Sequence, residues 1–254
     1  MFIEALVRHE VGCTSLWREK ILEYGVRDTA RLVADSGISL TGYCCAGFVT
    51  SMDKREAGNA LDDAKRAFDE AAILGAPSVV IVPGGLDPRD NNLDTTRKRA
   101  LDNIEKLIPY ARSLGIKIAL EPLHPMVCPT RNVLATLGLA NDWCDALGAE
   151  DIVGIVVDTY CVFWDPQIYA EIARAGERIC SFHVSDWLLD TKDLRLDRGM
   201  VGDGIIDNRR LRCAVERTGY RSYVEVEIFS ERNWWRRDPD EVVRIIKDRF
   251  QDTV

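Results

Sequence analysis

Short apolar runs alternate with amphipathic stretches along almost the whole chain. Runs rich in β-branched residues, such as SVVIVPGG from Ser78 and DIVGIVVDTY from Asp151, are typical of buried strands. Between such runs, segments including 60–74 and 95–115 carry apolar residues at helical spacing. Strict alternation of strands and helices predicts parallel strands in βαβ units. We therefore expect an α/β fold built on a parallel sheet.

The length of 254 residues suits one (β/α)8 barrel, or TIM barrel, which typically has about 250 residues. No internal repeat or linker divides the chain, so we expect one domain over residues 1–254. No glycine-rich fingerprint joins a strand to a helix, which argues against a dinucleotide-binding fold. The pattern gives only about seven strands, because residues 2–10 read as a helix before any strand. We expect a TIM barrel without its first strand, which would leave two unpaired sheet edges.

The missing strand has two explanations at this point: it is absent, or the start codon is internal to a longer gene.

The net charge of −8 argues against nucleic acid as a partner. The eight cysteines show no CxxC spacing, and the N-terminus does not read as a signal peptide. We therefore expect free thiols in a reducing cytoplasm, and no run is long enough to span a membrane. A small-molecule partner fits these features, and assembly with copies of the same chain stays open.

Four apolar strands each deliver a metal-type ligand near their C-terminal ends, where the active site of a barrel lies. Taken singly, each has another explanation: a salt bridge for Glu121, a helix cap or loop acid for Asp158, and a core histidine for His183. Their repetition at one depth favours a shared site. The last strand, YVEVEIF, carries Glu225 and Glu227 on one face. Spacing favours the more C-terminal Glu227, with Glu225 a layer deeper or against a neighbour.

Two glutamates, one aspartate and one histidine form a hard, oxygen-rich ligand set. Such a set is better suited to binding Mn²⁺, Mg²⁺ or Co²⁺ than to forming a zinc site of the thiolate kind. Two facing glutamates beside the metal can move a proton on and off carbon, while the metal polarises the neighbouring carbonyl and stabilises the enediolate. The sequence therefore predicts one divalent metal ion and proton-transfer chemistry.

Further polar and aromatic side chains follow the same strands and are candidate substrate contacts. Several have a structural alternative: a flexible turn around Arg198, a packed thiol at Cys161 and an oligomer contact at Trp234. His124 follows a proline-bounded turn, and we expect it near the ligands rather than among them. A helix with Thr130 as its N-cap is predicted to follow it. The candidate substrate contacts are His124, Cys161, Asp186, Arg198 and Trp234.

In this order, the segments EPLHP, VVDTY followed by WDP, FHVSDW, RGMVGDGIID and GY…VEVEIFS resemble the sugar phosphate isomerase/epimerase family of the xylose-isomerase-like TIM barrel superfamily. The resemblance runs from about Trp17 to Trp235. It implies an acid/base pair of Glu121 and Glu227. It also implies a divalent metal held by Glu121, Asp158, His183 and Glu227.

One position departs from the family. Epimerases of this type usually carry a histidine three residues after the metal aspartate, and here that position is Cys161. A thiol is a weaker hydrogen-bond donor than imidazole. We expect a metal-dependent isomerase or epimerase acting on a keto sugar or related polyol. The alternatives are a lyase or dehydratase of the same superfamily, acting on a keto-inositol or keto sugar, and a catalytically impaired sugar-binding relative.

Overall fold

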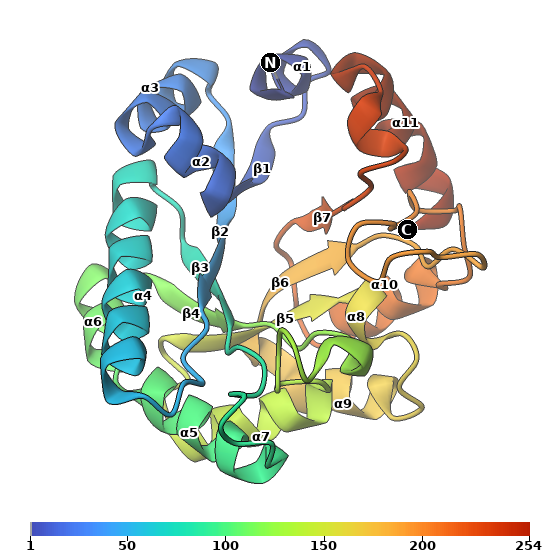
Figure 1. The fold of residues 1–254 in the computed structure, drawn as a ribbon. Coiled ribbons are helices and arrows are strands. Elements are labelled where there is room, and N and C mark those ends of the chain that lie inside the picture. Colours follow the sequence, from blue (N-terminus) through green and yellow to red (C-terminus); the bar gives the residue numbers. More distant parts are fainter. Residues whose placement is uncertain (1) are drawn as a thin grey trace.

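The strands form a single parallel sheet in the computed structural model, which describes residues 2–254 (Figure 1). Their spatial order is their order in the chain. Each strand pairs in parallel with the next one. The strands are β1 (Cys13–Trp17), β2 (Ser39–Gly47), β3 (Ser78–Val82), β4 (Lys117–Leu120), β5 (Val153–Asp158), β6 (Ile179–Val184) and β7 (Val224–Val226). The expected seven-stranded TIM-type barrel is confirmed.

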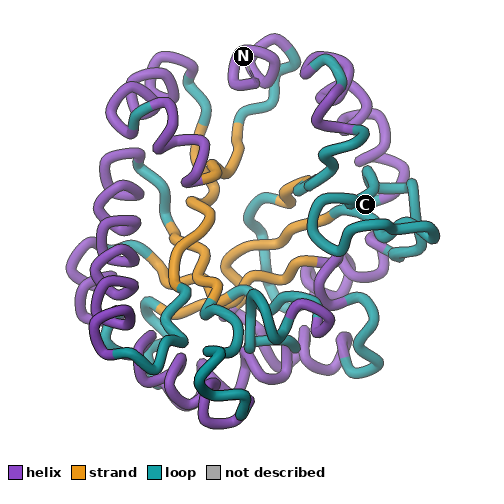
Figure 2. The backbone as a smooth tube through the Cα atoms, in the orientation of Figure 1, coloured by secondary structure: helices purple, strands orange, loops and turns teal. Residues whose placement is uncertain are grey.

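Helices cover the outside of the curved sheet (Figure 2), so β3 and β5 are buried along their whole length. This explains their continuous apolar sequences. The first half of the chain contributes α1 (Phe2–Arg8), α2 (Arg18–Tyr24), α3 (Val26–Ser36), α4 (Lys54–Leu74), α5 (Leu93–Glu105) and α6 (Ile108–Leu114). The second half contributes α7 (Leu137–Leu147), α8 (Thr159–Val162), α9 (Ile168–Ala175), α10 (Asn208–Arg217), α11 (Pro239–Thr253) and the short 3₁₀ turns η1 (Pro125–Val127), η2 (Gly176–Arg178) and η3 (Trp234–Arg236).

The barrel is open between its first and last strands. Within residues 2–254, β1 pairs only with β2, and β7 pairs only with β6. The helical layer nevertheless continues past the gap, because Arg8 of α1 donates from Nε to Asp240 Oδ1 of α11 at 2.9 Å. A cleft of about 660 Å³, largely apolar, lies between β1, β7 and these two helices. The two unpaired edges expected from the sequence are therefore present.

Two predicted helices have different bounds in the structure. The helix expected over 60–74 begins earlier, at Lys54, because the Asp53 carboxylate accepts from the backbone N–H groups of Arg55 and Glu56. The helix expected over 95–115 is divided into α5 and α6. Pro109 lies in the first turn of α6, where its missing N–H costs no helical hydrogen bond.

The predicted N-cap Thr130 is wrong. Residues 125–136 form η1 and a loop, and α7 begins only at Leu137. Its cap is Thr136, whose hydroxyl oxygen accepts from the backbone N–H of Leu139 at 3.1 Å. Apolar residues follow both threonines within three positions, so the sequence does not separate them. In the structure, the residues after Thr130 form a loop instead of the expected first turn of the helix. Among residues 2–254, every helix is too short or too polar to cross a membrane.

Candidate active site

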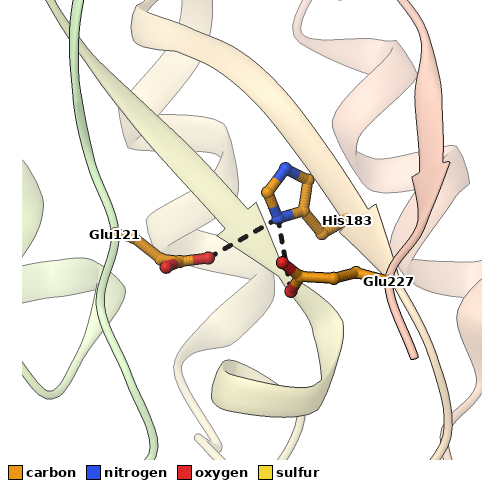
Figure 3. Close-up of side chains that lie close together, drawn as sticks. All are labelled: Glu121, His183 and Glu227. Carbon is orange, nitrogen blue, oxygen red and sulfur yellow. Dashed lines mark ion pairs between the residues drawn. The ribbon is translucent and has the colours of Figure 1, made fainter. Parts of the chain in front are cut away.

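Glu121, His183 and Glu227 meet at the C-terminal ends of three strands (Figure 3). His183 lies on β6, and the two glutamates directly follow β4 and β7. His183 Nδ1 is 3.5 Å from Glu121 Oε1 and 3.7 Å from Glu227 Oε2. One ligand atom from each side chain lies within 4.8 Å of the other two. The two carboxylates thus approach one imidazole nitrogen from different strands.

Backbone pairing beyond the regular strands fixes the depth of both glutamates. The N–H of Glu121 donates to the carbonyl of Ile81 at 3.2 Å, and the N–H of Glu227 donates to the carbonyl of Val184 at 3.0 Å. Asn132 Nδ2 also donates to the Glu121 carbonyl at 2.8 Å. Because side chains alternate along a strand, this pairing holds both carboxylates on the inner face of the barrel.

Two buried polar atoms in this cluster lack a hydrogen-bond partner within residues 2–254. They are Glu121 Oε1 and His183 Nδ1. Buried polar atoms are rarely left without a partner, because the lost solvation is costly. Both atoms are lone-pair donors when unprotonated, and they converge with Glu227. Two carboxylates and an imidazole therefore fit a divalent cation such as Mn²⁺, Mg²⁺ or Co²⁺.

Asp158 lies beside the three but its oxygens have other partners. It is fully buried at the end of β5 and pairs in register with His183. Its Oδ1 accepts from the backbone N–H of Tyr160 at 3.0 Å, which caps α8. Its Oδ2 is 2.9 Å from Arg198 Nη2. The helix-cap alternative considered from sequence is thus real, and a fourth-ligand role for Asp158 stays a prediction.

The two glutamates differ in their electrostatic surroundings. Burial raises the pKa of Glu121, and the charge of Glu227 adds to this, although His183 opposes it. Burial alone would raise the pKa of Glu227, but Arg198 and His183 together outweigh burial and lower this pKa to about 2. Arg198 Nη1 lies 3.1 Å from Glu227 Oε2. The pKa values of the two glutamates are therefore shifted in opposite directions, with that of Glu227 lowered and that of Glu121 raised.

The histidine is held among carboxylates. Burial alone would lower the pKa of His183, but Glu225, Glu121 and Glu227 together raise it well above its ordinary value. The proton and a divalent cation compete for the same nitrogen lone pair. Cation binding at Nδ1 therefore has to release a proton there.

The cluster opens into a cavity of about 360 Å³ that His124, Cys161 and Arg198 also line. The His124 ring lies 4.8 Å from that of Trp187, and burial lowers the pKa of His124. Cys161 Sγ donates to Asp158 Oδ2 at 3.1 Å. Burial raises the pKa of this thiol well above its ordinary value, so Cys161 is a neutral donor.

The other two predicted substrate contacts do not line this cavity. Asp186 is buried and accepts from the backbone N–H groups of Trp187, Gly202 and Ile206, so it holds the loop that carries Arg198. Trp234 is buried against the cleft beside β7, and its Nε1 donates to Asp203 Oδ2 at 3.3 Å. The polar atoms of both side chains therefore have hydrogen-bond partners outside the cavity.

Several residues that line the cavity or lie below it were not predicted from sequence. Tyr160 lies two residues after Asp158, and the guanidinium of Arg198 lies 4.4 Å from the centre of the Tyr160 ring. Ser181 contacts His183 below the cavity. The alternation in ICSFHV places Ser181 on the same face as His183, and this spacing was a usable signal. The remaining unpredicted cavity residues include Trp17, Cys44, Cys45 and Arg131.

None of the curated proteins matches this chain. Among solved structures, protein SMc04130 from Sinorhizobium meliloti 1021 is 40% identical, with a TM-score of 0.96 over 99% of this chain and 92% of that one. Two more distant structures are similar in fold: an IOLI protein with a bound zinc atom (21% identity, TM-score 0.84, 100% and 91% covered) and a D-psicose 3-epimerase in the presence of D-fructose (18%, 0.79, 99% and 92%).

A family model matches residues 5–248, nearly the whole described chain. Its description, xylose isomerase-like TIM barrel, agrees with the parallel sheet and with the side chains gathered at the strand ends. The chain belongs to the xylose isomerase-like TIM barrel family.

Proposed function

We propose that the chain is a divalent-metal-dependent isomerase or epimerase of a keto sugar or related polyol. The observation that carries this proposal is the approach of Glu121 and Glu227 to one nitrogen of His183 from two different strands. Relatives in fold include a D-psicose 3-epimerase, which supports the substrate class. The cavity of about 360 Å³ is large enough for a monosaccharide.

The difference between the glutamates suits proton transfer. Glu227, ionised beside Arg198, acts as the base that takes the proton from the carbon next to the carbonyl. Glu121, whose pKa burial raises, acts as the acid that returns a proton. Return to the opposite face of the same carbon gives an epimer, and return to the neighbouring carbon gives an isomer. In the reverse direction the two roles exchange.

Glu121, His183 and Glu227 would hold the metal, with Asp158 as the proposed fourth ligand. When bound, a divalent cation supplies the positive charge that favours the enediolate over the free carbanion. Arg198 and His124 line the cavity and offer N–H groups to the sugar oxygens. The related IOLI protein binds zinc, so zinc belongs in the assays beside Mn²⁺, Mg²⁺ and Co²⁺.

The test is hydrogen exchange at carbon. The protein is incubated with each metal and a panel of ketoses in D₂O, and deuterium entry into the sugar is followed by NMR. We expect Glu227→Gln to retain the fold and lose exchange by at least about 100-fold, the loss typical of removing a general base. Glu231→Gln, at an exposed position on the same segment, serves as the matched control. Undiminished exchange in Glu227→Gln would overturn the assignment.

One observation supports a dehydratase as the second candidate. The Tyr160 hydroxyl is buried beside the cavity and has no hydrogen-bond partner within residues 2–254. A dehydratase shares the first proton abstraction but must also protonate a departing hydroxide, and a phenol can donate that proton. Product mass separates the candidates, because dehydration removes one water and isomerisation leaves the mass unchanged. Sugar binding without either reaction would indicate the catalytically impaired relative.

A further inference from the structure

A buried polar pair lies directly below His183. Ser181 precedes it by two residues on β6, and Glu225 is its register partner on β7. Ser181 Oγ is 3.0 Å from His183 Nε2 and also 3.0 Å from Glu225 Oε1. Ser181 is 4% exposed, and the Glu225 side chain is 10% exposed. Glu225, Ser181 and His183 form one chain of hydrogen bonds, which ends at the candidate metal site.

The number of protons sets the direction of these bonds. The hydroxyl of Ser181 donates its single proton to Glu225 Oε1. The Ser181 oxygen must then accept from His183, which requires hydrogen on Nε2. In the neutral ring the lone pair is thereby left on Nδ1, the nitrogen that faces Glu121 and Glu227. In histidine metal ligands, the partner of the second nitrogen selects the tautomer in this way.

We propose that Ser181 and Glu225 are positioning residues that keep hydrogen on His183 Nε2 and so present Nδ1 to a divalent cation. This inference rests on the proposed function, because it requires that the cluster binds a cation. The pair acts through His183 and lies below the sugar cavity, since neither side chain lines it. Its effect therefore falls on metal affinity and on the imidazole tautomer.

Calorimetric titration with Mn²⁺ and Zn²⁺ tests the affinity. Ser181→Ala removes the acceptor for the Nε2 hydrogen, and we expect it to weaken binding about 10- to 100-fold, the usual effect of losing such a partner. Glu225→Gln provides a second variant of nearly the same shape, because its amide can donate to Ser181 and reverse the bond direction. Ser181→Thr retains the hydroxyl and should restore affinity to within about threefold of wild type, well inside the expected loss.

Ser78→Ala is the matched control. Ser78 is a buried serine on β3 for which no side-chain hydrogen bond is found within residues 2–254, and it lies outside the cavity. We expect its metal affinity to equal that of wild type. Circular dichroism establishes that each variant is folded before titration, so that a weak binder is distinguished from an unfolded one.

The tautomer is read directly by ¹⁵N NMR of the zinc-loaded protein. The chain has only three histidines, so the His183 signals are those absent from His183→Gln. We expect a proton on Nε2 and a metal-shifted Nδ1 in wild type, and loss of this pattern in Ser181→Ala or Glu225→Gln. If wild type binds metal and both variants keep wild-type affinity and tautomer, the inference is overturned while the proposed function stands. If wild type binds none of the cations, the proposed function itself fails.

Discussion

The guanidinium of Arg198 lies 2.9 Å from the carboxylate of Asp158, in a part of the barrel where both side chains are almost fully buried. The same guanidinium reaches Glu227 Oε2 at 3.1 Å. One arginine therefore pairs with two of the three acids that are predicted, together with His183, to bind metal. It also lowers the pKa of Glu227, whereas burial raises the pKa of Glu121. The acid/base roles proposed for the two glutamates use this difference, and Arg198 lies in the loop between β6 and α10.

Replacing Arg198 by methionine should destabilise the metal-free protein strongly. A buried ion pair that loses one partner leaves an uncompensated charge, which costs about 3–5 kcal/mol. Thermal and urea unfolding measure the loss. Added Mn²⁺ should recover part of it, because a cation at the neighbouring cluster also offsets the acids. Arg112→Met is the control, since Arg112 pairs with Asp151 at the exposed surface and little change is expected. Equal effects of the two substitutions would contradict a special role for Arg198.

Two glycines should respond to alanine in opposite directions. A Cβ at Gly85 would lie 2.5 Å from the carbonyl oxygen of Pro129, in the loop that leads from His124 to α7. We expect Gly85→Ala to lower stability by about 1–3 kcal/mol through this overlap. Gly58 lies within α4 with no atom near its added Cβ, so Gly58→Ala should raise stability by about 0.5–1 kcal/mol. Urea unfolding tests both, and a stabilising Gly85→Ala would show that the loop has room.

The strands, their parallel order and the depth of the ligands could be predicted from sequence. Alternation along a strand sets the face of each side chain, and the C-terminal ends of parallel strands share one rim. This is sufficient to bring Glu121, His183 and Glu227 together. The same reasoning does not predict the partners of each acid at the strand ends. Asp158 ends β5 and Asp186 follows β6, yet Asp158 faces Arg198 and Asp186 faces loop amides.

That difference depends on where the loop after β6 folds back. Asp186 accepts from Gly202, sixteen residues further on, and Arg198 reaches Asp158, forty residues before it. Local patterns carry no information on such distant pairings. The misplaced helix start at Thr130 has a similar origin, because Thr136 is an equally good cap and packing decides between them.

Adding Mn²⁺ to metal-free protein should raise its melting temperature. A ligand that binds only the folded state stabilises it by about 2.7 kcal/mol at 100 times its dissociation constant. The increase should disappear in His183→Gln and in Glu121→Gln, because each removes an atom of the converging set. A chelator should reverse the increase in wild type. Equal increases in wild type and both variants would place the metal elsewhere on the protein.

The metal-free protein should lose stability as the pH rises. The pKa of His183 is raised well above its ordinary value of 6.5, so its contribution is fully present below pH 6.5 and is lost as the pH rises through the folded-state pKa. Glu121, with a pKa raised above 4.5, changes stability in the same direction from a lower pH. Cation binding needs Nδ1 unprotonated, so the stabilisation by Mn²⁺ should grow over the same range. Melting temperatures from pH 5.5 to 9, with and without Mn²⁺, test both trends. His183→Gln should flatten them, and a metal-free wild type whose stability is constant above pH 6.5 would contradict the charge arrangement around His183.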